Sequence, residues 1–215
     1  MLMEEKNVFI AEPDGCGMDN SGGRKRESWY VFFAALCFVI IEVYYIAYES
    51  MIRFYDPYCF TMQDNLVSMV NHAIGFGLVL ALLFKNKMAC IVVVGINVAL
   101  SLWNILPIEY VELHTWVNLL SLVTLAAVLV LALRGNKILK MTWFIPALPQ
   151  IVAIVVDFGI NKVSFPSDLD MIGILCSLGK FKCVFACVAF ALTGLWLKNS
   201  TARGSLLGDA DPIQS

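Results

Sequence analysis

Long apolar runs separated by short polar segments dominate the chain. Six of these runs reach or approach the roughly 20 residues that a helix needs to cross the hydrocarbon core of a bilayer. Runs such as 91–94 and 128–131 are continuously apolar, whereas a membrane β-strand alternates apolar and polar positions. The pattern therefore predicts an all-α, polytopic membrane helix bundle. Its six transmembrane helices are expected near 29–51, 65–84, 88–106, 115–133, 141–160 and in a last stretch that ends near 197.

The start of the sixth span is ambiguous, because the last apolar stretch is too long for one upright helix. Ser167 and Asp170 resemble a capping box, which predicts a helix start just after Pro166. Gly179 suggests a division of this helix. A short helix would then cover 168–178 at the outer face, and the span itself would run from about 180 to 197.

Two lysines, Lys180 and Lys182, lie at the start of that shorter span. In the divided helix their long side chains extend to the membrane interface, as basic side chains readily do. In the alternative, one tilted helix holds Lys180 inside the bilayer, where it needs a carboxylate partner. Both lysines are therefore candidate ion-pair partners.

Basic residues are distributed unevenly among the segments between the spans. Counted within about 20 residues of a span, ten lie in the two tails and in alternate loops, against Arg53 and Lys162 on the other side, or against four if Lys180 and Lys182 count there. Because short loops rich in Lys and Arg stay in the cytoplasm, we expect both termini to be cytoplasmic and the plasma membrane to be the location. The ten are Arg24, Lys25, Arg26, Lys85, Lys87, Arg134, Lys137, Lys140, Lys198 and Arg203.

The expected organisation has three parts. Residues 1–28 are polar and glycine-containing and form a flexible cytosolic tail, 29–198 form the six-helix domain, and 199–215 form a second cytosolic tail. The composition, 60% apolar and 15% charged, excludes an ordinary soluble enzyme and a disordered regulator. The net charge of −2 gives no basic face for nucleic acid. The partner expected first is therefore the lipid bilayer.

Polar residues concentrate in the outer half of every span. Spacings of three, four or seven residues place them on single helix faces, and such faces almost always point into the bundle or into a water-filled cavity. The pattern predicts a polar pocket that opens outward, above an apolar inner half. The pocket candidates are Glu42, Tyr45, Glu49, Ser68, His72, Asn97, Ser101, Gln150 and Asp157.

Each candidate also has a structural interpretation. Glu42 near the midplane can pair with His72 or Lys180 without any ligand, and Asp157 lies close enough to the outer surface to be solvated. Asn97 and Gln150 are the kind of residues that join helices by hydrogen bonds. The three tyrosines of the first span can form an interfacial belt instead of a pocket wall; they are Tyr44, Tyr45 and Tyr48.

Small residues and prolines predict how the helices pack. Three spans carry small residues four positions apart, which lets helix backbones approach closely. Pro146 and Pro149 are expected to bend the fifth span. The small-residue stripes are Ala73, Gly77 and Ala81, then Gly95 and Ala99, then Cys183, Cys187 and Ala191.

Motifs of catalysis and of metal binding are absent from the sequence. It has no HExxH, P-loop, GxGxxG or nucleophile elbow, and its seven cysteines include no CxxC pair. Cys90 and His72 are predicted at opposite depths, which opposes a thiol protease, and Cys59 and Cys176 are a candidate disulfide. Glu109, Glu112 and His114 share one outer loop and could contact a metal ion, but their spacing is unspecific and a solvated acidic loop is the default interpretation. We therefore expect no catalytic residue, no metal and no cofactor, and the enzyme class remains open but disfavoured.

Three functions remain. The outward polar pocket favours a small solute-binding or transport protein, and the short loops without motifs suit a non-catalytic accessory or sensor subunit of a membrane-protein partner. An intramembrane enzyme has the least support. The size, span number and orientation are similar to those of vitamin-binding subunits of energy-coupled transporters. That family usually carries an alanine pair four residues apart in its first span, whereas here Phe38 follows Ala34 and Val39 follows Ala35.

Overall fold

The computed structural model describes residues 21–56, 58, 61–105, 113–135, 138–160 and 171–208. In these residues the secondary structure is entirely helical. Six helical segments are long and apolar enough to cross a membrane, which confirms the predicted number. The elements are α1 (Ser21–Tyr55), α2 (Met62–Leu83), α3 (Lys87–Ile105), α4 (Leu113–Leu133), α5 (Leu139–Thr142), the 3-10 helix η1 (Ile145–Ala147), α6 (Leu148–Ile154), the π-helix η2 (Val155–Ile160) and α7 (Met171–Gly208).

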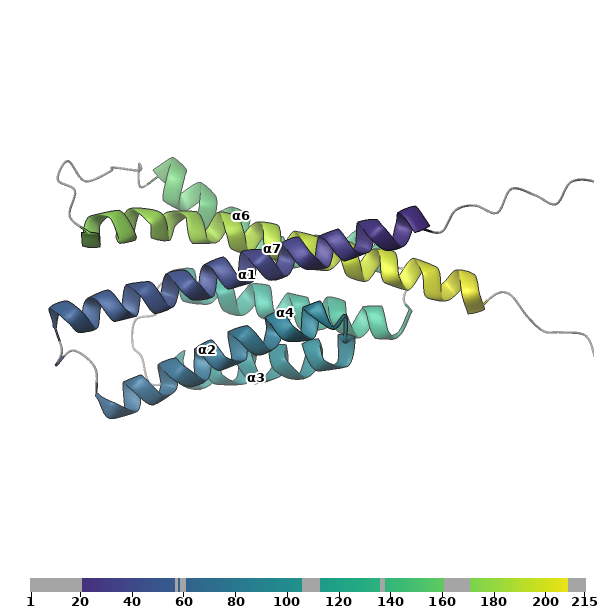
Figure 1. The fold of residues 1–215 in the computed structure, drawn as a ribbon. Coiled ribbons are helices and arrows are strands. Elements are labelled where there is room, and N and C mark those ends of the chain that lie inside the picture. The colour runs from purple at the N-terminus through teal and green to yellow at the C-terminus, as the bar shows by residue number, and fades with distance from the viewer. Residues whose placement is uncertain are drawn as a thin grey trace, which may run out of the picture.

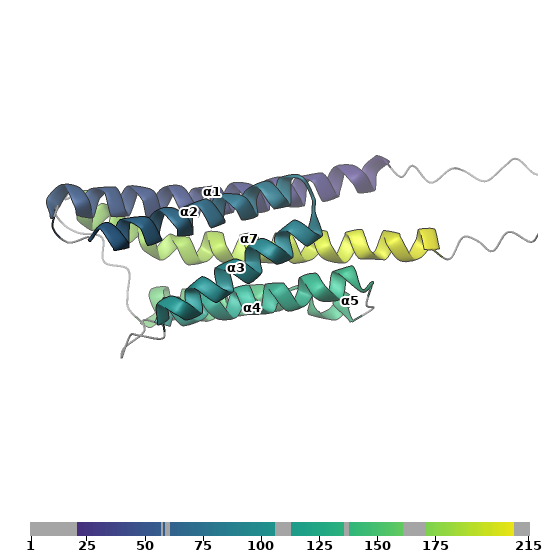
Figure 2. The same cartoon turned by 90° about the horizontal axis from the view of Figure 1, so that it is seen from below.

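The helices pack side by side into one elongated bundle (Figure 1). α1 packs most extensively against α7 and also contacts α2, while α4 contacts α6 and α7. α3 crosses obliquely between α2 and α4, as Figure 2 shows. The first residues of α1 and the last residues of α7 lie at the same end of the bundle (Figure 1). We call this the terminal end and the opposite one the distal end.

The ends of the helices have identifiable local causes. Thr61 caps α2 by accepting a hydrogen bond from the Asp64 amide, and the Asp64 side chain accepts one from the Thr61 amide in return. α1 already begins at Ser21 and α7 ends only at Gly208. Both terminal helices therefore extend into stretches that the sequence analysis assigned to the tails.

The fifth span is broken rather than continuous. It consists of α5, η1, α6 and η2, and its two prolines, Pro146 and Pro149, lie in η1 and in the first turn of α6. Proline has no amide hydrogen and its ring collides with the preceding turn, so it interrupts a helix. The bend expected at these two positions is confirmed.

The sixth span is one uninterrupted helix, which contradicts the predicted division at Gly179. α7 runs through Gly179, and this glycine lies against α1, where an added Cβ would collide with the Tyr44 side chain. The glycine therefore permits a close helix contact instead of ending a helix. With 38 residues, α7 is about 57 Å long and exceeds a hydrocarbon core of about 30 Å. The predicted capping box at Ser167 and Asp170 lies outside the described residues.

The apolar core occupies the half of the bundle nearer the terminal end. It combines the first half of α1, the second halves of α2, α4 and α7, and the first half of α3. This is the half that the polarity pattern predicts to be apolar. Its most buried side chains include Leu82, Val94, Leu125, Leu129, Trp196 and Leu197.

Small residues support packing at only some of the predicted positions. Ala81 is buried and Gly77 contacts the Val93 side chain. Gly95, by contrast, is exposed, and no described atom lies within 4 Å of a Cβ added there, so the stripe expected on the third span is wrong. The closest approach occurs at Gly194, where an added Cβ would collide with the backbone oxygen of Trp143. Four-residue spacing alone therefore does not identify the contact face.

The outer surface of the bundle is rich in large apolar side chains. Val92 is 56% exposed, Trp103 74% and Leu120 54%. A soluble protein rarely leaves such a surface uncovered, whereas in a membrane lipid chains cover it. The six apolar helices and this surface together suggest a multi-pass membrane protein.

Candidate functional site

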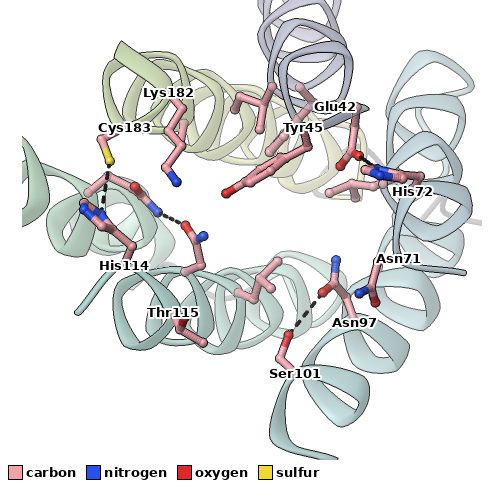
Figure 3. Close-up of a pocket in the computed structure, with 18 of the residues that line it drawn as sticks. Glu42, Tyr45, Asn71, His72, Asn97, Ser101, His114, Thr115, Lys182 and Cys183 are labelled. Atoms are coloured by element: carbon pink, nitrogen blue, oxygen red, sulfur yellow. Dashed lines mark hydrogen bonds and ion pairs between the residues drawn. The ribbon is translucent and has the colours of Figure 1, made fainter. Parts of the chain in front are cut away.

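A cavity of about 340 Å³ lies in the distal half of the bundle, among α1, α2, α3, α4, α6 and α7. Figure 3 shows side chains from these helices pointing into one open space. Seven of the nine predicted pocket residues line it, so faces that lie far apart in the sequence do converge. These seven are Glu42, Tyr45, Glu49, His72, Asn97, Ser101 and Gln150.

A histidine between two carboxylates forms the wall at α1 and α2. His72 Nδ1 lies 2.9 Å from Glu42 Oε2, and its Nε2 lies 3.5 Å from Glu49 Oε1. Glu49 also accepts a hydrogen bond from the Ser68 hydroxyl and pairs with Arg53 at 3.2 Å. Ser68 therefore supports the wall through Glu49, although it does not itself line the cavity. Of the two partners expected for Glu42, the structure places His72 beside it.

Gly75 makes room for this arrangement. It is buried on α2, one helical turn from His72, and a Cβ added there would collide with the Glu42 carboxylate. Any other residue at 75 would push Glu42 away from α2. His72 and Gly75 lie three residues apart on one face of α2, and together they permit the contact with Glu42.

The opposite wall comes from α4, α6 and α7. Lys182 points toward the cavity, and its Nζ lies 5.1 Å from the centre of the Tyr45 ring (Figure 3). The Gln150 amide donates to Asn118 Oδ1 at 2.9 Å and to Ser121 Oγ at 3.2 Å. Gln150 is fully buried, and its Oε1 has no hydrogen-bond partner among the described residues.

Amide side chains from α2 and α3 close the third side. Asn71 and Asn97 face the space in Figure 3, and the Ser101 hydroxyl donates to Asn97 Oδ1 at 3.4 Å. Asn104 completes this side. Each of these side chains offers both donors and acceptors, so the wall can adapt to either kind of group.

Asp157 occupies a different place from the one expected. It is buried, at 5% exposure, and contacts His114 and Cys183 instead of solvent. It lines a second, adjoining cavity of about 510 Å³, as does Lys180. Five of the described residues line both cavities: Tyr45, His114, Thr115, Asn118 and Lys182.

Asp157 and Gln150 both contact α4, as their seven-residue spacing predicts. Gln150 donates to Asn118 and Ser121, and Asp157 pairs with His114, one turn before Asn118. Asp157 lies in the π-helix η2 and also contacts Cys183 of α7, whereas Gln150 lines the first cavity.

Several cavity residues were missed as site candidates. Thr115 and Asn118 are polar positions near the start of the fourth span, and that polarity was the available signal. His114 was placed in a loop but lies in the first turn of α4, and Cys183 was interpreted as packing alone. Asn71 and Asn104 were missed as well. Apolar side chains such as Phe38, Leu122 and Phe190 line the cavity toward the core.

Other cysteine and loop predictions are resolved only in part. Cys37, Cys90, Cys183 and Cys187 are free thiols. Cys90 lies near the start of α3 at the terminal end, far along the bundle from His72, as expected. The proposed disulfide stays a prediction, because Cys59 and the Cys176 side chain lie outside the described residues, as do Glu109 and Glu112.

Chemically, the site combines an acid–histidine wall, an amide wall and a lysine around one space. This arrangement can bind a polar group through several directed hydrogen bonds inside an otherwise apolar bundle. No protein-family model, no curated protein and no solved structure matches the chain.

Proposed function

We propose that this protein binds a small polar solute in the distal cavity, as a membrane solute-binding or transport protein. The observation that carries the proposal is the Glu42–His72 pair, which borders a cavity of about 340 Å³ inside an apolar bundle. Ligand sites usually measure about 300–1,000 Å³. The volume therefore suits a solute with few non-hydrogen atoms.

A purely structural role explains the polar side chains less well. A charged residue in the middle of a membrane helix costs about 2.5–3.5 kcal/mol on insertion scales. A structural ion pair offsets this cost best when the helices close around it and exclude other partners. Here five polar side chains from α2, α3, α4 and α6 surround an open space beside the pair: Asn71, Asn97, Asn104, Asn118 and Gln150. An open polar space is what a binding site requires.

The charges around the cavity indicate the class of solute. Two carboxylates, Glu42 and Glu49, line the cavity together with Lys182, and Arg53 pairs with Glu49 from outside it, so carboxylates and permanent cations are equal in number. A balanced site favours a solute without net charge. Lys182 and the two carboxylates come from different walls, which suits a zwitterion or a polyol with donors and acceptors at both ends.

The direction of access follows from the basic residues. The start of α1, the end of α7 and the described basic residues Lys85, Lys87 and Arg134 lie at the terminal end, and positively charged loops stay in the cytoplasm. We therefore place the terminal end in the cytoplasm and the cavity on the outer side of the plasma membrane. In this orientation the apolar core separates the bound solute from the cytoplasm, and transport requires that core to open.

Binding to purified protein in lipid nanodiscs tests the proposal. A panel of amino acids, sugars, polyols and nucleobases is screened by thermal shift, and hits are measured by calorimetry. The Glu42→Gln change removes a charged hydrogen-bond acceptor, which should weaken binding by about tenfold or more. The matched change Asp64→Asn alters an exposed capping carboxylate away from the cavity and should leave affinity unchanged. Absence of binding across the panel, or equal effects of the two changes, would reject the proposal in favour of an accessory subunit.

A further inference from the structure

A histidine, an aspartate and a cysteine meet where the two cavities join. His114 comes from the first turn of α4, Asp157 from η2 and Cys183 from α7. His114 Nε2 lies 3.3 Å from Asp157 Oδ1, and Cys183 Sγ lies 3.7 Å from both His114 Nδ1 and Asp157 Oδ2. One ligand atom from each residue can be chosen so that all three lie within 4.8 Å of one another. Three separate segments thus bring an imidazole, a carboxylate and a thiol close together.

The donor types and their spacing match a tetrahedral metal site. Zinc binds thiolate sulfur at about 2.3 Å and imidazole nitrogen or carboxylate oxygen at about 2.0–2.2 Å. Tetrahedral ligands at these distances are separated by about 3.3–3.8 Å. One donor atom from each of the three residues lies within 4.8 Å of the others, so a small closure of the side chains would bring them to this spacing. We propose that His114, Asp157 and Cys183 form a binding site for a zinc-type divalent transition-metal ion.

Three protein ligands leave the fourth position of a tetrahedral zinc site without a protein ligand. Asp157 and Cys183 are nearly inaccessible, whereas the His114 side chain is 30% exposed and lines both cavities. Zinc sites with three protein ligands keep a fourth position for water or for a bound molecule. Here that position faces the cavity, so water or a donor atom of a cavity ligand completes the coordination.

A metal ion also accounts for the chemistry that surrounds Asp157. A buried carboxylate is costly unless it is paired or coordinates a metal. A divalent ion would compensate both Asp157 and the thiolate of Cys183, and it would release the thiol proton on binding. Two lysines also border this place: Lys182, whose ammonium group lies over the Tyr45 ring, and Lys180, which lines the second cavity together with Asp157.

The same three residues also resemble a nucleophile with its base and acid, and burial distinguishes the two interpretations. A nucleophilic sulfur must reach its substrate, but Cys183 is only 3% exposed. A metal ligand needs no such access. The structure therefore favours coordination over attack by the thiol. The inference does not depend on the proposed solute, because the metal alone is the probe.

Titration of the apoprotein with Co²⁺ tests the site directly. The protein is purified in detergent, stripped with a chelator and titrated, and the thiolate-to-cobalt charge-transfer band is followed. We expect one bound ion per chain, and Zn²⁺ should displace it. Cys183→Ser should abolish the band, and Asp157→Asn should weaken binding by more than about 100-fold, since even outer-shell changes cost 10–100-fold. Absence of the band in the unmodified chain would overturn the proposal.

Cys187→Ser is the matched control. It lies one turn further along α7, and its sulfur contacts the Ala147 carbonyl at 3.9 Å instead of the cluster. This variant should retain the band and the affinity, and loss of the band here as well would contradict the assignment. Size-exclusion profiles and helix content compare the variants for folding. If Cys183→Ser is misfolded, His114→Gln provides the same test from α4, and unchanged Co²⁺ affinity in a folded His114→Gln protein would also overturn the proposal.

Discussion

Replacing His72 with leucine is expected to lower the free energy of unfolding by about 3 kcal/mol, the upper end of the range for leaving a buried polar group without its hydrogen-bond partner. The histidine side chain is 17% exposed and lies between Glu42 and Glu49. Without it, Glu42 loses the hydrogen bond to His72 Nδ1, whereas Glu49 keeps its pair with Arg53. The loss therefore comes from the Glu42 carboxylate left without its partner and not from the missing ring. Reversible unfolding in mixed micelles gives the free energy.

Two comparisons make this prediction specific. Asn71→Leu changes the preceding residue on α2, which is exposed toward the cavity, and should shift stability by no more than about 0.5 kcal/mol. Adding Glu42→Gln to His72→Leu should recover part of the loss, because the unpaired charge is removed. A double-mutant cycle measures this coupling. Equal losses for His72→Leu and Asn71→Leu, or strict additivity in the cycle, would show that the pair does not stabilise the fold.

Gly194→Ala is expected to destabilise the protein by about 2–3 kcal/mol, the upper part of the range for overpacking. The added methyl group would meet the backbone oxygen of Trp143. A backbone atom cannot rotate away as a side chain can, so α7 and the start of the broken fifth span must separate. Helix propensity opposes this effect, because alanine is the better helix former by about 1 kcal/mol. The expected net change is still a loss.

Gly95→Ala is the control for this second prediction. Gly95 also lies within an apolar helix, but a Cβ there meets no described atom within 4 Å. The substitution should leave stability unchanged or raise it by up to about 1 kcal/mol. Thermal unfolding of both variants in the same detergent gives the comparison. If Gly194→Ala is as stable as Gly95→Ala, the close approach of α7 to Trp143 is wrong.

Much of the architecture follows from hydropathy and helical spacing alone. The six apolar helices are found close to the predicted positions, because length and apolar content are local properties of the chain. The convergence of Glu42, His72 and Asn97 was also predictable. Polar groups in membrane helices avoid lipid, so a polar stripe indicates which way a helix turns.

The errors arise where a contact between distant segments overrides a local signal. Gly179 is typical of a helix break, but in α7 it leaves room for the Tyr44 side chain of α1. Asp157 is expected to be solvated from its position near the outer surface, but it contacts His114 and Cys183. None of these partners is adjacent in sequence, so the sequence by itself cannot reveal the contacts. The same reason explains why the His114–Asp157–Cys183 cluster was missed.

Cysteine accessibility across a membrane tests the central claim, a water-filled cavity that opens at the distal end. Asn97 lines the cavity, whereas Val94, one helical turn away on α3, is fully buried in the apolar core.

Asn97→Cys and Val94→Cys are reconstituted in vesicles, and a tag at the C-terminus reports orientation. A membrane-impermeant maleimide is applied to either side, and peptide mass spectrometry identifies the labelled position. The account predicts that only Asn97→Cys is labelled, and only from the side opposite the tag. Labelling of Val94→Cys, or labelling of Asn97→Cys from the tag side alone, would contradict it.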